Sequence, residues 1–253
     1  MSMAVETVGL SKAFSGKVAV DRIDLRVQRA CMYGFLGPNG AGKSTTIKML
    51  TGLLAPDQGE VRVLGYDLSL QPLEVKRRIG VVPEDLCLFE NLTAREYLTF
   101  IGRMHGLAPE VLRARSEELL ALMELEATGK TLTLEFSHGM KKKLSLAASL
   151  IHAPELLFLD EPFEGIDPIA SRTLRTVLER FVERGGTVFI TSHILEIVER
   201  LCTHVGIIHK GRLVRQSSKS DLMANDSLEH AFVEAVGEAG KDESALSWLG
   251  DSV

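Results

Sequence analysis

The chain has 253 residues, of which 25% are charged and 45% hydrophobic, and its formal net charge is −5. This ordinary globular composition predicts one large core with an inserted or appended subdomain rather than two independent domains. The negative charge argues against a nucleic-acid partner, because proteins that bind nucleic acids usually carry a basic domain.

The cysteines, Cys31, Cys87 and Cys202, are widely separated and form no C-x-x-C pair. Neither a disulfide framework nor a zinc site is therefore predicted, and we expect three small core residues in a reducing compartment. The sequence lacks an apolar run of about 18 residues, and residues 1–10 do not resemble a signal peptide. We expect a soluble, cytoplasmic protein that needs another subunit if it acts at a membrane.

The first third of the chain reads as strands around one helix. Alternating apolar residues between positions 4 and 37 predict an antiparallel sheet that leads into a buried strand over residues 32–36. A helix is predicted over residues 45–54 and a turn over residues 56–59. Two further strands are predicted, over residues 60–64 and over residues 79–83, where Pro83 ends the strand.

After Glu84 the pattern changes from strand to helix. Thr93 and Glu96 have the spacing of a capping box, and Pro109 begins a second helix. The apolar residues carried by these two predicted helices are Tyr97, Leu98, Ile101, Met104, Val111, Leu112, Leu119, Leu120 and Leu122. Residues 85–153 are therefore predicted to form a helical subdomain inserted between two halves of an α/β core.

The α/β pattern resumes at residues 156–159, whose fully apolar run suits a parallel strand buried on both faces. Asp167 and Pro168 predict the start of a helix. The remaining expected elements are strands over residues 187–191, 205–208 and 213–215, a helix over residues 194–201, and a last helix capped by Asp226 and Glu229 with Leu228, Phe232, Val233 and Val236 on one side. After Gly237 we expect a loosely held tail in which Leu246, Trp248 and Leu249 can dock.

Residues 37–44 read Gly-Pro-Asn-Gly-Ala-Gly-Lys-Ser and fit the phosphate-binding loop G-x-x-x-x-G-K-[ST] at every constrained position. Glycines at positions 37, 40 and 42 are expected to let successive N–H groups turn toward an anion. The following helix adds the partial positive charge of its N-terminus. Lys43 is expected to contact the β- and γ-phosphates of a nucleotide, and Ser44 to bind Mg²⁺.

Asp160 and Glu161 follow a buried strand, at the sheet edge where open α/β proteins bind their ligands. We expect Asp160 to hold Mg²⁺ through water and Glu161 to polarise the attacking water. His193 follows another strand and is expected to donate to the γ-phosphate. The alternatives are that the two acids cap a neighbouring helix and that His193 only begins one.

Two features have open interpretations. Phe14 is either an exposed aromatic that stacks on a nucleotide base or a core residue. Lys141, Lys142 and Lys143 form the one dense basic run, for which a solvated helix face is the simplest interpretation.

These residues together resemble the ATP-binding subunit of an ABC transporter, over residues 4–236. The motifs occur in the family's order: Phe14 at the base-stacking aromatic, Gly37 to Ser44 at Walker A, Glu84 at the Q-loop, Ser137 to Met140 at the signature, Asp160 at the end of Walker B, Glu161 as the catalytic carboxylate, Asp167 in the D-loop and His193 at the switch histidine. The resemblance implies a P-loop NTPase (RecA-like) α/β core with an N-terminal antiparallel β-subdomain and an inserted helical subdomain. In this arrangement, residues 1–84 hold the antiparallel β-subdomain and the first part of the P-loop core, and residues 85–153 form the inserted helical subdomain with the signature motif. Residues 154–216 complete the core, and residues 217–253 form the C-terminal helix and tail.

The sequence departs from the family pattern at three places. Glu84 replaces the usual Gln, and the signature reads Phe-Ser-His-Gly-Met rather than Leu-Ser-Gly-Gly-Gln. Both changes resemble the ABC-2 exporter subgroup, whose permeases are separate subunits. The turn before the Walker A strand lacks its usual Gly at Ala30 or Cys31.

The resemblance implies two chains that close head to tail around two ATP molecules with Mg²⁺, and a transmembrane permease that contacts the surface around residues 84–98. Catalytic roles are implied for Glu161, His193 and Lys43, and metal binding for Ser44, Glu84 and Asp160. Nucleotide contacts are implied for Phe14, Gly37, Pro38, Asn39, Gly40, Ala41, Gly42, Lys43, Ser44, Thr45, Ser137, Gly139 and Asp167. The subunit would lie on the cytoplasmic face of the membrane through the permease.

Two other functions fit the sequence less well. A soluble ABC-type ATPase acting on ribosomes or DNA ends usually has two cassettes or a long coiled coil, and this sequence has neither an internal repeat nor heptads. A phosphate-loop kinase or GTPase would not explain Ser137 and Gly139 together with His193, and the sequence has no N-K-x-D string. The cargo, the direction of transport and homodimer versus heterodimer stay open.

Overall fold

The computed structural model describes residues 2–223 and 228–236. Its strands are β1 (Met3–Phe14), β2 (Lys17–Ile23), β3 (Arg26–Gln28), β4 (Met32–Leu36), β5 (Gln58–Val63), β6 (Tyr66–Asp67), β7 (Ile79–Val82), β8 (Leu156–Leu159), β9 (Thr187–Ser192), β10 (His204–His209) and β11 (Arg212–Ser218). Its α-helices are α1 (Lys43–Leu50), α2 (Pro72–Lys76), α3 (Ala94–Met104), α4 (Pro109–Leu122), α5 (His138–Leu150), α6 (Pro168–Glu183), α7 (Leu195–Leu201), α8 (Lys219–Met223) and α9 (Leu228–Val236).

The larger sheet has six strands in the order β11-β10-β4-β9-β8-β7. Strands β10, β4, β9, β8 and β7 pair in parallel, and β11 is antiparallel to β10. Strands β4, β8 and β9 are buried along their whole length, as their apolar runs predicted. Their carboxyl ends lie side by side at one edge of the sheet, because neighbouring parallel strands finish at the same edge.

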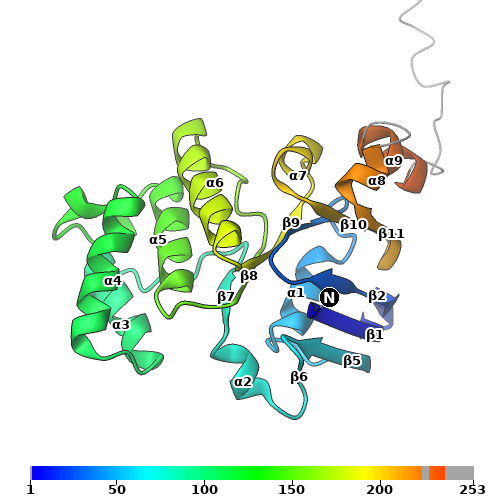
Figure 1. Cartoon of the computed structure of the whole chain (residues 1–253), viewed down its shortest axis with the longest axis horizontal. Coiled ribbons are helices and arrows are strands. Elements are labelled where there is room, and N and C mark those ends of the chain that lie inside the picture. Colours follow the sequence, from blue (N-terminus) through cyan, green and yellow to red (C-terminus); the bar gives the residue numbers. More distant parts are fainter. Residues whose placement is uncertain (1, 224–227, 237–253) are drawn as a thin grey trace, which may run out of the picture.

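The smaller sheet is antiparallel and is formed by β1, β2, β3, β5 and β6. It lies at the lower right of Figure 1, with α1 behind it. Apolar residues of both sheets and of α1 form one hydrophobic core, which includes Leu10, Phe35, Ile47 and Phe189. This core holds α1 against both sheets.

Helices α3, α4 and α5 lie between β7 and β8 in the chain and are grouped with α6 on the left of Figure 1. Their apolar faces form a second hydrophobic core with the neighbouring face of the larger sheet, including Leu98, Leu120, Leu144 and Leu159. The capping box is present: the Glu96 amide donates to Thr93 Oγ1 over 3.3 Å, and the Thr93 amide donates to Glu96 Oε2 over 2.9 Å. Met104 and Val111 lie on the two predicted helices but outside this core, since they are 71% and 42% exposed.

Some predicted boundaries and elements also differ. The helix predicted over residues 45–54 spans Lys43–Leu50, because the chain turns at residues 51–54. Strand β6 and helices α2 and α8 were not predicted, and each has five residues or fewer. Asp226 and the tail after Val236 lie outside the described residues.

Cys31 and Cys202 are buried as predicted, whereas Cys87 is exposed. It lies between β7 and α3 in a segment without regular structure, where no apolar layer covers the side chain.

Ala30, where the family pattern has Gly at this turn, has a φ of 54°. This is the left-handed region that glycine adopts without strain. The missing glycine therefore does not change the turn, because Ala30 adopts the conformation.

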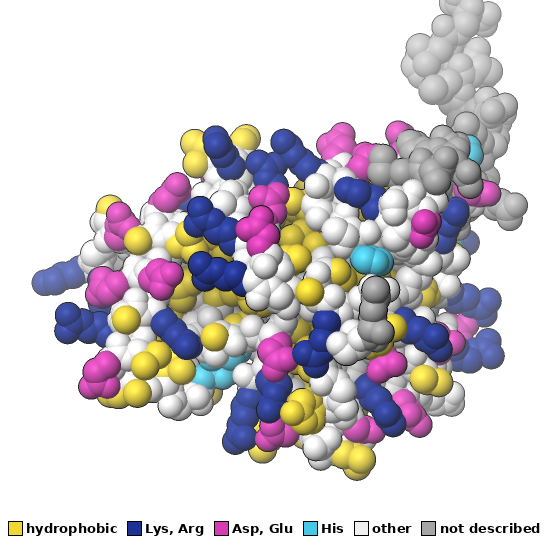
Figure 2. Space-filling model, in the orientation of Figure 1, with side chains coloured by type: hydrophobic (Ala, Val, Ile, Leu, Met, Phe, Trp, Pro, Cys, Tyr) yellow, Lys and Arg dark blue, Asp and Glu magenta, His cyan; other side chains and the backbone are white. Residues whose placement is uncertain are grey.

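On the face shown in Figure 2, basic and acidic side chains are interspersed rather than separated into large patches of one sign. Among the described residues, no helix combines the length and apolar character needed to cross a bilayer.

Candidate functional site

The phosphate loop connects the end of β4 with the start of α1. Gly42 is the N-cap of α1 with a φ of 110°, and a Cβ there would lie 2.5 Å from the carbonyl oxygen of Ala19. Only glycine fits this position. Gly37 is required for another reason than predicted: its φ is not positive, but a Cβ would clash with the carbonyl oxygen of Ile208.

A pocket of about 400 Å³ lies over this loop. It is lined by Ala19, Asn39, Gly40, Gly42, Lys43, Ser44, Thr45, Glu84 and Glu161. The N-terminus of α1 opens into the pocket, so that unpaired backbone amides and the Lys43 side chain face the same space. The pocket has the size and the donors to take a polyphosphate.

Lys43, Glu161 and His193 form a continuous row of polar side chains. Lys43 Nζ donates to the carbonyl oxygen of Gly37 over 2.8 Å and lies 3.1 Å from Glu161 Oε1. The other oxygen of the same carboxylate, Glu161 Oε2, lies 3.1 Å from His193 Nδ1. The side chains of Lys43 and Glu161 are only 7% and 6% exposed. The two opposite charges are therefore buried as a pair, and each compensates the other.

The residues predicted to bind Mg²⁺ carry the oxygen donors that this cation prefers. Ser44 Oγ donates to Glu84 Oε2 over 3.2 Å, which joins the loop to the segment after β7. Asp160 is buried, and its Oδ1 accepts a hydrogen bond of 2.5 Å from Thr191 Oγ1. A hydroxyl and two carboxylates therefore fit the expected cation.

Glu161 has a strained backbone that is bonded on both sides. Its φ is 46°, in the left-handed region. Its amide donates to Thr191 Oγ1 over 3.0 Å, and its carbonyl oxygen accepts a 2.6 Å hydrogen bond from Lys142 Nζ. The position of the carboxylate therefore depends on β9 and on α5.

Ser137 is the N-cap of α5, and its Oγ accepts from the amide of Met140 over 3.2 Å. Asp167 is the N-cap of α6 and accepts from the amides of Ile169 and Ala170 over 2.8 and 2.9 Å. These bonds, that of Ala170 above all, lower the pKa of Asp167. The two helix starts adjoin, since a Cβ at Gly139 would lie 3.4 Å from Asp167 Oδ2. None of Ser137, Gly139 and Asp167 lines the phosphate pocket of its own chain.

Phe14 is 47% exposed at the end of β1. It pairs with Lys17 across the β1–β2 hairpin, and Ala19 on β2 lines the phosphate pocket. This placement excludes the alternative of a core residue; Lys12 Nζ lies 5.8 Å from the centroid of the ring, and Phe14 itself does not line the pocket.

The predicted solvated lysine face is wrong. Lys142 is 2% exposed and Lys143 7% exposed, because α5 packs between β7, α3 and α6. Lys143 Nζ bonds Glu124 Oε2 over 2.6 Å. Sequence reasoning thus missed Lys142 and Thr191, and the only available signal for Lys142 was the basic run next to the signature.

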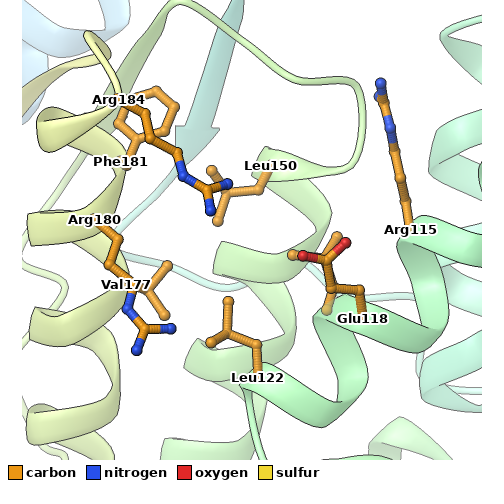
Figure 3. Close-up of a pocket in the computed structure, with 9 residues that line it drawn as sticks. Arg115, Glu118, Leu122, Leu150, Val177, Arg180, Phe181 and Arg184 are labelled. Atoms are coloured by element: carbon orange, nitrogen blue, oxygen red, sulfur yellow. The ribbon is translucent and has the colours of Figure 1, made fainter.

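A separate groove of about 240 Å³ lies between α4, α5 and α6 (Figure 3). Arg115, Arg180 and Arg184 surround apolar side chains that include Leu122, Val177 and Phe181. None of the predicted site residues lines this groove.

Residues 20–164 match the family model described as "ABC transporter". The linearmycin resistance ATP-binding protein LnrL of Bacillus subtilis (strain 168) is 37% identical, with 93% of this chain and 76% of the relative covered. The bacitracin transport ATP-binding protein BcrA of Bacillus licheniformis is 41% identical over 85% of this chain and 70% of the relative.

Solved structures agree with these relatives. One described as an ATP binding subunit of an ABC transporter has a TM-score of 0.85 and 31% identity, covering 92% of this chain and 99% of the other. A dimeric ATP-binding cassette in a post-hydrolysis state with ADP and Pi shares the fold, with a TM-score of 0.78 and 21% identity over 85% of this chain and 98% of the other. With the phosphate pocket and the adjoining carboxylates, these findings identify the chain as a member of the ABC transporter family, an ATP-binding subunit that acts as an ATPase.

Proposed function

We propose that this chain hydrolyses Mg-ATP as a dimer and drives export through a separate membrane permease, at the cytoplasmic face of the membrane. The observation that supports this most directly is the row of Lys43, Glu161 and His193 beside the phosphate pocket. The proposal gives Lys43 the role of binding phosphate, Glu161 that of acting on water and His193 that of contacting the γ-phosphate, and the closeness of the three side chains supports it. The proposed division of the chain is a β-subdomain with the first part of the core (1–84), a helical subdomain (85–153), the rest of the core (154–216) and a C-terminal segment (217–253).

Each residue of the row has a role that follows from its contacts. Lys43, with the loop amides, would bind the β- and γ-phosphates in place of its present bonds to Gly37 and Glu161. Glu161, once released from Lys43, would accept the proton of the attacking water. His193 would donate to the γ-phosphate, and its Nδ1 lies 3.1 Å from Glu161 Oε2. Ser44, Glu84 and Asp160 would hold Mg²⁺, which supplies positive charge to the phosphate oxygens when bound.

The second half of the site would come from another copy of the chain. Ser137 and Gly139 lie at the N-terminus of α5, which is a potential anion site, and Ser137 is exposed. Because neither residue lines the phosphate pocket of its own chain, we infer that they meet the γ-phosphate bound to the partner, with Asp167 beside them. Two ATP molecules would then lie between two chains, and hydrolysis would weaken the charge-assisted contacts that hold the dimer closed.

The permease would dock beside the segment after β7. A groove of about 420 Å³ is lined there by Pro83, Cys87, Leu88, Tyr97 and Ile101, among others. Next to it, Phe89 and Phe100 are 53% and 41% exposed and their rings lie 5.0 Å apart. Exposed aromatic side chains beside a groove are typical of protein interfaces, and relatives whose names include "Bacitracin transport" and "Nod factor export" support a transport role.

The first test uses Glu161→Gln, with Glu60→Gln as a matched control on an exposed carboxylate of β5. We expect Glu161→Gln to bind ATP, to hydrolyse it about 100-fold or more slowly, and to elute as a dimer with ATP in size-exclusion chromatography. Glu60→Gln should turn over like wild type. Wild-type turnover of Glu161→Gln, or a monomer at saturating ATP, would contradict the proposal.

The second test concerns the permease surface. Phe89→Ser with Phe100→Ser should abolish copurification of a polytopic membrane protein from a native host, while ATP hydrolysis by the isolated subunit stays intact. As a control, Val8→Ser changes another exposed apolar residue, which is 64% accessible and lies on β1 in the smaller sheet. If the membrane protein still copurified after the double substitution, Phe89 and Phe100 would not belong to the permease interface.

A further inference from the structure

Lys142 is a buried cation in the second turn of α5. It is 2% exposed, and its Nζ donates to the backbone carbonyl oxygen of Glu161 over 2.6 Å. Burial lowers the pKa of Lys142, and the negative charges of Glu164, Glu161, Glu84 and Asp160 oppose this effect. The Lys142 side chain is thus buried within the influence of four acids, and one carbonyl oxygen accepts a hydrogen bond from its Nζ.

The carbonyl that Lys142 binds belongs to the strained residue of the site. A non-glycine residue with φ near 46° is held in that conformation only by its surroundings. The Glu161 amide is fixed by Thr191, and its carbonyl oxygen accepts from Lys142 and, over a longer 3.2 Å, from the Glu164 amide. Lys142 is therefore the one side chain in the described structure that donates to this carbonyl oxygen, and it comes from a different element.

A rotation of the Glu161 peptide would also move the Glu161 carboxylate. Its two carboxylate oxygens are placed against Lys43 and His193 at 3.1 Å each. A small change in the backbone of Glu161 would move both oxygens out of these positions, and misplacement by about 1 Å can reduce catalysis about 100-fold.

We propose that Lys142 is a positioning residue for hydrolysis: it holds the left-handed backbone of Glu161 and thereby places the carboxylate beside the phosphate pocket. This inference rests on the proposed role of Glu161 as the group that polarises water. It gives α5 two tasks, because Ser137 at its N-terminus faces the partner's site in the proposed dimer while Lys142, further along the helix, acts on the chain's own carboxylate.

The substitution Lys142→Met removes the donor and the charge but keeps an unbranched side chain of similar length. We expect kcat for ATP to fall about 10- to 100-fold while KM and the affinity for a non-hydrolysable ATP analogue stay unchanged. Lys142→Arg keeps a cationic donor and should restore most of the rate. Lys141→Met on the same helix is the matched control: Lys141 lies only within 4.0 Å of Glu90, and its loss should leave kcat unchanged.

A second readout separates positioning from general destabilisation. Lys142→Met should accumulate as an ATP-bound dimer, as Glu161→Gln does, because both changes would leave binding intact and impair hydrolysis. If Lys142→Met does not fold, Lys142→Gln with the Lys142→Arg rescue gives the same comparison of kcat with KM.

The outcomes distinguish this inference from the proposed function. If Glu161→Gln hydrolyses ATP normally, the role of Glu161 is wrong. If Glu161→Gln is inactive but Lys142→Met keeps wild-type kcat, or if Lys142→Met loses ATP affinity and kcat together and Lys142→Arg does not restore them, Lys142 does not position the carboxylate.

Discussion

Lys43 Nζ and Glu161 Oε1 lie 3.1 Å apart, so the phosphate loop after β4 and the acidic segment after β8 meet as a buried ion pair. Strand β9 lies between β4 and β8 in the sheet, and His193, which follows it, contacts the other oxygen of Glu161. The cation proposed to bind phosphate is therefore paired with the carboxylate proposed to act on water. Under this proposal, nucleotide binding would release the carboxylate from Lys43.

This pairing predicts a non-additive effect on stability. Lys43→Met leaves the Glu161 carboxylate buried without its cation, and we expect the free energy of unfolding to fall by about 3 kcal/mol. Adding Glu161→Gln should recover about 1–3 kcal/mol of this loss. Chemical denaturation of the two single variants and the double variant measures the coupling. Additive losses would show that the two side chains do not stabilise each other.

The proposed contact of Lys43 with phosphate also predicts that Lys43 contributes to ATP affinity. Loss of a charge-assisted contact to phosphate, worth about 1.5–3 kcal/mol, should weaken ATP binding by Lys43→Met about 10- to 100-fold. Lys48→Met, an exposed residue of the same helix, should bind ATP like wild type. Titration calorimetry with ATP measures both dissociation constants, and equal affinities in the two variants would contradict the prediction.

Ala30 offers a stabilising substitution. Its φ of 54° costs about 1–2 kcal/mol for a residue with a side chain, and glycine would remove this cost. Glycine also gives the unfolded chain more conformational entropy, which offsets part of the stabilisation. Ala30→Gly should therefore raise the free energy of unfolding by about 0.5–1 kcal/mol. Ala121→Gly, at an exposed position within α4, should lower it by about 1 kcal/mol. Thermal and urea denaturation must give opposite signs for the two variants.

His152 predicts a pH dependence of stability. Burial, together with the neighbouring ring of His105 at 3.8 Å, lowers the pKa of His152 from its ordinary value of 6.5 to about 4. Between pH 6.5 and pH 4 the unfolded chain binds a proton here that the folded chain does not, so stability falls as the pH falls through this range.

The contribution of one such group is at most about 1.4 kcal/mol per pH unit. His152→Gln removes the titrating ring, and its amide can still donate to the carbonyl oxygen of Ile79, which His152 Nε2 meets at 2.9 Å. Denaturant midpoints from pH 7 to pH 4.5 should decline less in the variant. Parallel curves would assign the acid sensitivity to other groups.

Removing the Thr93 cap should lower stability without lowering the rate of ATP hydrolysis. Thr93→Ala removes the side-chain acceptor of the capping box at the start of α3 and should cost about 1 kcal/mol. Thr99→Ala removes a hydroxyl that bonds the Arg95 carbonyl within the same helix, where Ala is the better helix former, and should cost nothing. ATP turnover should match wild type in both variants, and equal stabilities would show that the cap is dispensable.

The sequence alone determined the elements with strong local causes. The phosphate loop has a spacing that few other structures require, the apolar run of residues 156–159 predicted a strand buried on both faces, and Thr93 with Glu96 and Asp167 with Pro168 marked two helix starts. Each of these signals depends on neighbours in the chain, which a sequence displays directly.

The tertiary structure decided what depends on strand order and packing. The sequence places residue 43, residue 161 and residue 193 far apart, and only the order β4-β9-β8 brings their side chains together. The burial of Lys142 is of the same kind: lysine usually favours water, and only the position of α5 between the sheet and its neighbouring helices places this cation under Glu161. Contacts between distant parts of the chain are set by the whole core, and no local pattern of residues encodes them.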